Sequence, residues 1–193
     1  MKIDKALIRK CVDGDRRSQS KLYELSFSHM MSIASRYYIN REDAISCVNG
    51  CFLKILLGLK SFDHENGLKS YFSWSKKIMM NLLIDEFRKN KIDKNTLNYI
   101  EDSNYLDQLL PEDYNAIEQM MHAESLQNML GKLSEIQRSI FNLFAIDGYS
   151  HKEIANALEI SSDNSKYHLS QARKYLQAML KKEIEKQKNK LDA

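Results

Sequence analysis

The residues best suited to chemistry lie between positions 149 and 176, and they are suited to binding nucleic acid. This segment reads YSHKEIANALEISSDNSKYHLSQARKYL, and its second half is rich in cations and amides. Such side chains donate hydrogen bonds to base edges in the major groove and neutralise phosphates. If that half is a helix, its outer face carries Asn164, Lys166, Tyr167, His168, Gln171, Arg173 and Lys174.

Two short helices joined by a tight turn would position these side chains. Ser150 and Glu153 have the spacing of a capping box, in which the two residues satisfy each other's free amides. The apolar residues predicted to face inward are Ile154, Ala155 and Leu158 on the first helix, Ile160 in the turn, and Leu169, Ala172 and Leu176 on the second. This pattern is typical of a helix-turn-helix, whose second helix lies in the major groove. A purely structural hairpin is the alternative, but the capping box, the small Ala155 and the basic second helix favour DNA binding.

Other kinds of site are poorly represented. Cys47 and Cys51 have a spacing that places two metal ligands on one helix face, but Cys51 falls within an apolar stripe. Together with Cys11 they make an odd number without a disulfide framework, so buried, reduced thiols are favoured over a metal site. No carboxylate pair, His/Cys cluster or Gly-rich phosphate loop stands out. We therefore expect no catalytic residue, metal, cofactor or small-molecule substrate.

The charge is distributed unevenly along the chain, although the net charge is only +3. Residues 1–92 carry 17 Lys/Arg against 10 Asp/Glu, and residues 126–193 carry 11 against 8. Between them, residues 93–125 carry one Lys and eight acids. Two basic lobes separated by an acidic connector indicate a polyanionic partner, although basic lobes that are merely soluble remain an alternative.

The scarcity of turn residues predicts an all-α fold. The chain has six Gly and one Pro in 193 residues, whereas strand-rich folds need turn residues at every reversal. Apolar spacing predicts helices at 4–13, 18–39, 41–60 and 69–91, and then at 115–131, 134–146, 151–159 and 163–184. We expect two small helical domains joined by an acidic linker. No secretory signal and no membrane span are expected, and the protein is predicted to be cytoplasmic.

The second lobe resembles the C-terminal DNA-binding domain of extracytoplasmic-function (ECF) sigma factors of bacterial RNA polymerase. The resemblance includes EIANALEIS, LSQARKYL and the preceding LSEIQRSIFNLFAIDGYSHKEIA. In the first lobe, residues 15–56 resemble the sigma region that docks on polymerase, and YFSWSKKIMMNLLIDEFRKNK (71–91) resembles the helix that melts and reads the minus-ten element. Two blocks in the right order are more specific than either alone.

The resemblance implies a division of the chain and a set of binding residues. It implies sigma region 2 at 1–92, an acidic linker at 93–114, region 4 at 115–185 and a Lys-rich tail at 186–193. Minus-ten contacts are expected from Trp74, Lys77, Asn81, Arg88 and Lys89, and polymerase contacts from Asp43, Asn49, Phe52 and Leu53. The minus-thirty-five contacts would come from the outer face of the helix-turn-helix described above. Trp74 is also interpreted as a core residue with Ile78 and Leu82, and Asp85 as the partner of a base such as Lys89.

The implied function is that of a non-enzymatic sigma factor that binds core RNA polymerase and promoter DNA and directs promoter melting and initiation. We expect a monomer when free, and the resemblance allows a membrane-bound anti-sigma factor as a further partner. The alternative is a stand-alone helix-turn-helix regulator, which usually needs a dimer and a palindromic site. Acidic or amide residues are usual in the family where Ser46, Asn49 and Gly50 stand. A Gly is usual at the position of Glu159, and a Thr-Val pair at Asn164-Ser165.

Overall fold

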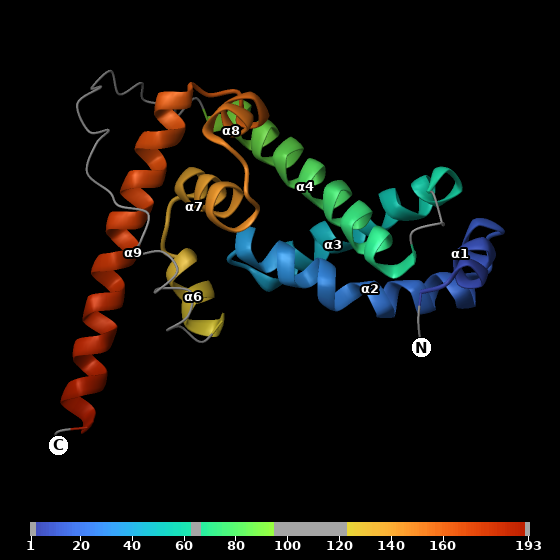
Figure 1. Ribbon diagram of the computed structural model, residues 1–193, viewed down its shortest axis with the longest axis horizontal. Helices are drawn as coiled ribbons and strands as arrows, with labels where there is room; N and C mark the ends of the chain where they lie inside the picture. The colour runs from blue at the N-terminus through green and yellow to red at the C-terminus, as the bar shows by residue number, and fades with distance from the viewer. Residues whose placement is uncertain (1–2, 63–66, 95–122, 192–193) are drawn as a thin grey trace. The chain divides into compact units, whose positions relative to one another are not determined.

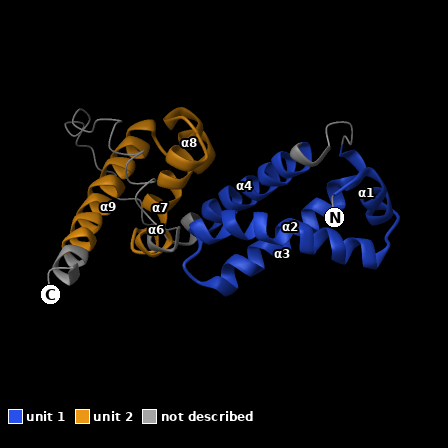
Figure 2. Cartoon of the chain, turned by 60° about the horizontal axis from the view of Figure 1, so that its bottom comes forward, with its two compact units in different colours: residues 1–92 blue, residues 93–193 orange. Residues whose placement is uncertain are grey.

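The chain consists of two compact units, residues 1–92 and 93–193, which are coloured separately in Figure 2. The computed structural model describes residues 3–62, 67–94 and 123–191, with side chains at 3–62, 70–90 and 127–185. Every regular element in these residues is helical. The predicted all-α fold class is therefore confirmed, together with its two small helical domains and the helix-turn-helix of the second. Most of the predicted linker, residues 95–114, lies outside the described residues.

The first unit is built from four α-helices and one short 3-10 turn (Figure 1). Their bounds are α1 Lys5–Val12, α2 Arg16–Tyr37, α3 Arg41–Gly58, η1 Leu59–Ser61 and α4 Gly67–Lys94. The starts of α1, α2 and α3 are capped by Asp4, Asp15 and Asn40, whose side chains accept a backbone amide of the first turn. The four helices predicted for this lobe are present, with bounds shifted by a few residues.

The core of the first unit encloses one polar bond among apolar side chains. Leu22, Ile55, Leu59 and Tyr71 are 0% exposed. The Ser26 hydroxyl donates to the Leu22 carbonyl at 2.7 Å and lies 2.8 Å from the Tyr71 hydroxyl. Because the Ser26 proton is already committed, Tyr71 donates to Ser26, and a buried phenol is thereby satisfied.

The buried face of α4 differs from the sequence-based interpretation. The helix buries Tyr71, Ser75, Met79, Met80 and Leu83, whereas Trp74, Ile78 and Leu82 are half-buried at the border of this stripe. The sequence pattern is ambiguous because two adjacent stripes of α4 are apolar. Only the contacts with the other helices determine which of the two stripes is buried.

The ion-pair partner of Asp85 comes from another helix. The Asp85 carboxylate lies 4.0 Å from the Lys54 amine on α3, and both side chains are half-exposed. The prediction was a neighbouring base, such as Lys89 one turn along the same helix, and in the described residues that base is Lys54. The tertiary neighbour replaces the local one because α3 brings Lys54 against this part of α4.

The three cysteines are buried, and all of them are free thiols. Burial raises the pKa of Cys11 and of Cys47 to about 11 and that of Cys51 to about 12, with smaller contributions from Asp15, Glu86 and Cys47 respectively. The Cys47 sulfur also lies 3.6 Å from the Met79 sulfur. Protonated thiols in apolar surroundings act as small hydrophobic residues, which agrees with the interpretation as buried, reduced cysteines.

One stretch of the described residues, 41–61, is long and apolar enough to cross a membrane, with a mean hydropathy of 1.4. The sequence had been interpreted as containing no such stretch. Its buried residues are Ala44, Cys47, Val48, Cys51, Phe52, Ile55 and Leu59. These side chains help to form the core of the first unit, and Lys54 of the same helix pairs with Asp85. We therefore interpret the stretch as a core helix.

In the second unit, four α-helices and a π-helical segment are described. Their bounds are α6 Ala123–Leu130, α7 Glu135–Phe141, η3 Asn142–Ile146, α8 His151–Leu158 and α9 Ser162–Leu191. The first half of the helix predicted at 115–131 lies outside the described residues. The helix predicted at 134–146 changes to π geometry over its last turn, where the Asp147 amide donates to the Asn142 carbonyl five residues back. Gly148, with a φ of +78°, then reverses the chain.

The last helix is longer than predicted. It begins at Ser162 and continues to Leu191, whereas the apolar period supported an end near 184. The added residues, 185–191, contain no Gly or Pro, and they include three Lys together with one Glu, one Gln and one Leu, all of which favour a helix.

We predict that Leu22→Ala lowers the free energy of unfolding of the first unit by about 2–5 kcal/mol, because it leaves a cavity at a fully buried position. The fluorescence of Trp74, the only tryptophan of the chain, reports on this unit during urea unfolding. The control is Leu57→Ala, at a leucine that is 76% exposed, which should change the free energy by less than about 0.5 kcal/mol. Equal effects of the two variants would contradict the assigned core.

Candidate nucleic-acid interface

The helical hairpin of α8 and α9 is held together by the residues that the sequence analysis placed inside it. Ile154 and Leu158 of α8 and Leu169, Ala172 and Leu176 of α9 are all buried, and Ala155 is 9% exposed. The predicted inward face is therefore confirmed. The third wall of this core comes from α7, whose Ile140 and Phe141 are buried and which packs along α9 (Figure 1).

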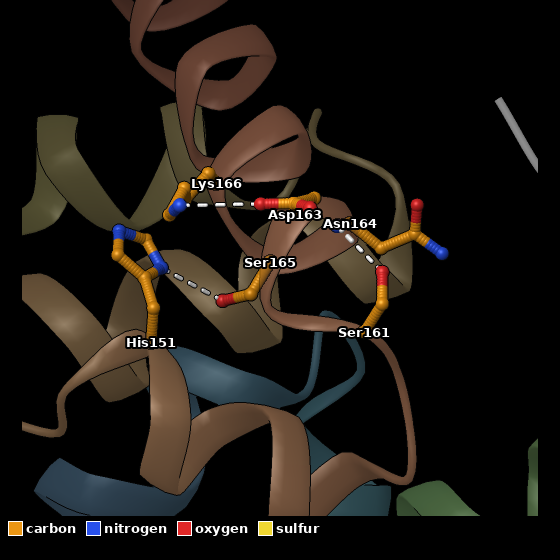
Figure 3. Close-up of polar contacts among 6 residues, drawn as sticks. All are labelled: His151, Ser161, Asp163, Asn164, Ser165 and Lys166. Atoms are coloured by element: carbon orange, nitrogen blue, oxygen red, sulfur yellow. Dashed lines mark hydrogen bonds and ion pairs between the residues drawn. The ribbon is translucent and has the colours of Figure 1, made fainter. Parts of the chain in front are cut away.

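Both helices of the hairpin begin with a serine cap. The Ser150 amide donates to the Glu153 carboxylate at 2.8 Å, and the Glu153 amide donates back to the Ser150 hydroxyl at 3.3 Å. The predicted capping box is thus confirmed. At the start of α9 the backbone N–H of Asn164 donates to the Ser161 hydroxyl at 3.0 Å (Figure 3). These caps fix where each helix begins, and therefore which residues stand in the first turn of α9.

The turn between the helices contains a residue in the left-handed region. Glu159 has φ 55° and ψ 47°, and its amide donates to the Ala155 carbonyl as the cap of α8. The Ile160 amide also donates to the Ala155 carbonyl, at 3.1 Å. A residue with a Cβ atom is strained in this conformation, which explains why a Gly would be favoured at this position.

The seven predicted DNA-binding residues of α9 divide into two groups. Lys174 is exposed, and Asn164, Lys166, Tyr167 and Gln171 are partly exposed on the face opposite the buried stripe or beside it. We call these five residues the outer face of α9. Lys166 also pairs with Asp163 at 3.1 Å (Figure 3).

The remaining two residues, His168 and Arg173, flank the buried stripe and are partly exposed, and their predicted contact with DNA stays a prediction. The Nδ1 atom of His168 is buried and makes no hydrogen bond to any described residue. The Arg173 guanidinium carbon lies 5.6 Å from the centre of the Phe144 ring. A helix turns by 100° per residue, so residues next to the buried stripe point sideways; polarity alone had suggested that both residues face outward.

A second aromatic contact ties the start of α8 to the π-helical segment. The His151 ring stacks on Phe144 with centroids 4.5 Å apart and planes inclined by 27°. The Nδ1 atom of His151 lies 2.9 Å from the hydroxyl of Ser165, which is 0% exposed. Burial lowers the pKa of His151, and the nearby charges of Lys166 and Arg173 lower it further. Sequence reasoning missed this pair because its two members are 14 residues apart and lie on different helices.

In the first unit, the predicted minus-ten residues lie on α4. Lys77, Asn81 and Lys89 are exposed, and Arg88 is half-exposed. Trp74 instead packs inward: its ring centroid lies 4.8 Å from that of Phe62, and a Cβ atom at Gly58 would come within 3.0 Å of the indole. Trp74 thus has a packing role, and its predicted contact with DNA stays a prediction, like those of the other four.

The predicted polymerase-binding residues lie along α3. Asp43, Asn49 and Leu53 are exposed, with Leu53 exposed to 59%. Phe52 is buried, and its ring centroid lies 5.0 Å from that of Tyr23 with the two planes nearly perpendicular. It therefore packs beneath the exposed residues of α3. The Tyr23 hydroxyl donates to the Asn49 side-chain oxygen at 2.7 Å.

Leu57 extends this surface by one turn and was not predicted. Its side chain is 76% exposed, and it lies four positions after Leu53. That spacing places two leucines on one helix face, and it was the available signal in the sequence. Polymerase binding to this surface of α3 is not tested by the structure, so these assignments stay predictions.

Comparison with known proteins bears on the second unit. Residues 123–176 match the family model for sigma-70, region 4. The second unit contains a sigma-70 region 4 domain. The matched residues run from α6 through the first half of α9 and include the whole helix-turn-helix. The sequence-based recognition of a sigma factor is thereby confirmed, and so is its assignment to transcription.

Two solved structures are similar to the chain over most of its length. One is the structure of CnrH in complex with the cytosolic domain of CnrY, with 21% identity, 92% of this chain and 97% of that chain covered, and a TM-score of 0.44. The other is the sigma factor RpoE in complex with the anti-sigma factor NepR from Bartonella quintana, with 21% identity, coverages of 84% and 96%, and a TM-score of 0.45. At these scores neither similarity bears on function. No curated protein sequence matches the chain.

We predict that Glu159→Gly makes the region 4 domain more stable than Glu159→Ala by about 1 kcal/mol. Both variants remove the glutamate side chain, and only glycine adopts the left-handed conformation of the turn without strain. Urea unfolding followed by far-UV circular dichroism measures the difference. An alanine variant as stable as the glycine variant would show that the turn has another conformation in solution.

We predict that the region 4 domain loses stability as the pH falls below about 6.5. Burial lowers the pKa of His168 and, together with Lys166 and Arg173, that of His151, from the ordinary value of 6.5. The unfolded chain therefore binds protons at these imidazoles before the folded domain does, and the free energy of unfolding decreases in acid. The measurement is urea unfolding at pH 7.5 and 5.5.

The control for this prediction is a chain with both His151→Phe and His168→Phe. Because the two imidazoles are absent from its folded and unfolded states alike, this variant should lose less stability between pH 7.5 and 5.5 than the wild type. An equal loss in both proteins would assign the pH dependence to other groups.

Proposed function

We propose that the chain is an ECF sigma factor that binds core RNA polymerase and directs it to promoters with two separate DNA-binding units. The observation that carries this proposal is the sigma-70 region 4 match on residues 123–176, a segment that includes the helix-turn-helix. In this proposal the protein selects and melts promoters while the polymerase performs the chemistry. It acts in the cytoplasm and is a monomer when free.

The region 4 domain reads the minus-thirty-five element through the outer face of α9. This face combines Asn164 and Gln171, which can bond base edges, with Lys166 and Lys174, which can neutralise phosphates. The caps and the buried stripe hold α9 at a fixed angle to α8, as a helix entering the major groove requires. A single small module makes few base contacts, so its affinity alone is modest.

The first unit binds the minus-ten element through the exposed side of α4. Lys77 and Asn81 stand one turn apart, and Arg88 and Lys89 continue the line toward the end of the helix. Cations in such a row neutralise successive phosphates of a single strand, while an amide bonds a base or the backbone. Trp74, held by Phe62 and Gly58, supports the face of α4 that carries these residues.

Polymerase binds the exposed side of α3, which presents Asp43, Asn49, Leu53 and Leu57. Two leucines more than half exposed on consecutive turns are costly in water and are suited to a partner surface. Tethering both DNA-binding units to one polymerase raises the effective concentration of each at its element, and this compensates for modest individual affinities. An anti-sigma factor at the membrane is a further proposed partner, on the resemblance of the sequence to ECF sigma factors alone.

The test is a pull-down with core RNA polymerase, followed by run-off transcription on genomic fragments. We predict that Lys166→Ala weakens promoter use and lowers the salt slope of promoter binding by about one unit, while polymerase affinity is unchanged. Leu53→Ala should do the opposite and lower polymerase affinity several-fold, because it truncates an exposed apolar contact. Both residues are on the surface, so neither substitution should unfold the chain.

Two outcomes would contradict the proposal. If both substitutions reduce polymerase affinity equally, the division of roles between the units is wrong. If the purified chain binds a palindromic duplex tightly as a dimer and has no affinity for polymerase, it is a stand-alone helix-turn-helix regulator.

A further inference from the structure

A side-chain hydrogen bond connects the two helices of the hairpin at the end where α9 begins. The His151 Nδ1 atom and the Ser165 hydroxyl are 2.9 Å apart and face each other in Figure 3. His151 is the first residue of α8, and Ser165 is the fourth residue of α9. The bond therefore joins the two helices at their N-terminal turns.

The His151 ring is also held by stacking against the Phe144 ring. The two rings are stacked at 4.5 Å, and the Arg173 guanidinium of α9 lies against the same Phe144 ring at 5.6 Å. The π-helical segment, α8 and α9 thus meet around one aromatic ring. An imidazole held in this way has little freedom to follow Ser165 if α9 rotates.

The imidazole is neutral at physiological pH, and the neutral ring is able to make the bond. Burial, Lys166 and Arg173 all lower the pKa of His151. A neutral ring bonds the Ser165 hydroxyl through Nδ1 in either tautomer, because the hydroxyl can donate or accept. Since Ser165 is fully buried, the bond also satisfies a polar group that would otherwise be costly to bury.

The apolar contacts between α8 and α9 lack this directionality. Leu169, Ala172 and Leu176 pack through apolar surfaces, which tolerate small rotations and shifts of a helix. A hydrogen bond weakens steeply when its angle or length changes. Ser165 lies between Asn164 and Lys166 in sequence, so fixing Ser165 also fixes the directions in which these two outer-face residues project.

We propose that His151 and Ser165 are a positioning pair that sets which base pairs of the minus-thirty-five element Asn164 and Lys166 read. This inference rests on the proposed function. In this proposal neither residue of the pair contacts DNA, because Ser165 is buried and His151 acts through Ser165. The pair therefore determines specificity through the orientation of α9.

The experiment measures promoter preference with the full chain and core RNA polymerase. The template is a DNA library randomised at both the minus-thirty-five and the minus-ten elements, and transcribed molecules are sequenced. His151→Phe keeps a ring against Phe144 and removes the nitrogen. His151→Asn removes the ring and keeps a polar atom on Cγ, where Nδ1 is attached. Ser165→Ala removes the hydroxyl.

We expect His151→Phe and Ser165→Ala to lose discrimination at one or two adjacent minus-thirty-five base pairs by about tenfold, a loss comparable to one base contact. The variant with both substitutions should have the same preference as either single variant, because the two residues act through one bond. His151→Asn should retain the wild-type preference. The minus-ten preference, recorded from the same transcripts, should be unchanged in all variants.

A purely structural role gives a different result. If the variants keep the wild-type preference at every minus-thirty-five base pair and are only enriched more weakly, the bond stabilises the domain without positioning α9, and the inference is wrong. It is equally wrong if His151→Asn behaves like His151→Phe. Urea unfolding of each variant shows whether weaker enrichment follows a loss of stability.

The wild-type protein separates failure of this inference from failure of the proposed function. If the wild type with core polymerase selects no promoter sequence, the sigma-factor proposal fails and this inference fails with it. If the wild type selects both elements and the variants do not change the minus-thirty-five preference, only the inference about the positioning pair fails.

Discussion

The second unit depends on one constraint: helix α9 must bury one side and present the other. Leu169, Ala172 and Leu176 fill the space against α7 and α8, and with a period of 3.6 residues this leaves Tyr167, Gln171 and Lys174 on the opposite side. The buried side cannot turn outward without exposing the core. The orientation of the candidate DNA-binding face is therefore a consequence of core packing rather than of any interaction with DNA.

Several polar groups near this core have hydrogen-bond partners, which reduces the free-energy cost of burying them. Ser150, Glu153 and Ser161 satisfy the amides that each helix start leaves free, and Ser165 is satisfied by His151. His151, which contacts α9, and His168 of α9 have pKa values lowered by burial, so both imidazoles are neutral at physiological pH while the lysines of the outer face are charged. Electrostatic attraction to a polyanion is thus concentrated where the helix can use it.

In the first unit, core packing also determines which side of each helix is exposed. Ser26 and Tyr71 connect α2 and α4 through one buried bond, and α3 contributes thiols that remain protonated. Because α3 is buried on one side, its other side is free to present Leu53 and Leu57 to solvent. The exposed residues of α3 include Leu53 and Leu57, whereas those of α4 include Lys77 and Lys89. Separate helices can therefore serve separate partners, as the proposed division between polymerase and DNA requires.

The sequence by itself determined the features that depend on local spacing. The all-α class followed from the scarcity of Gly and Pro, the capping box from Ser150 and Glu153, and the buried hairpin residues from the period of Ile154, Leu158, Leu169 and Leu176. Helix capping and amphipathic periodicity operate within a few residues, so they can be recognised without knowing the neighbours.

The tertiary structure alone decided which of two apolar lines on α4 is buried, that Asp85 pairs with Lys54, and that Arg173 lies against the Phe144 ring. It also brought together His151 and Ser165, which are 14 residues apart. Each of these outcomes depends on which surfaces of different helices meet. The period of a single helix specifies a direction around its own axis, but not the side chains that the folded chain places in that direction.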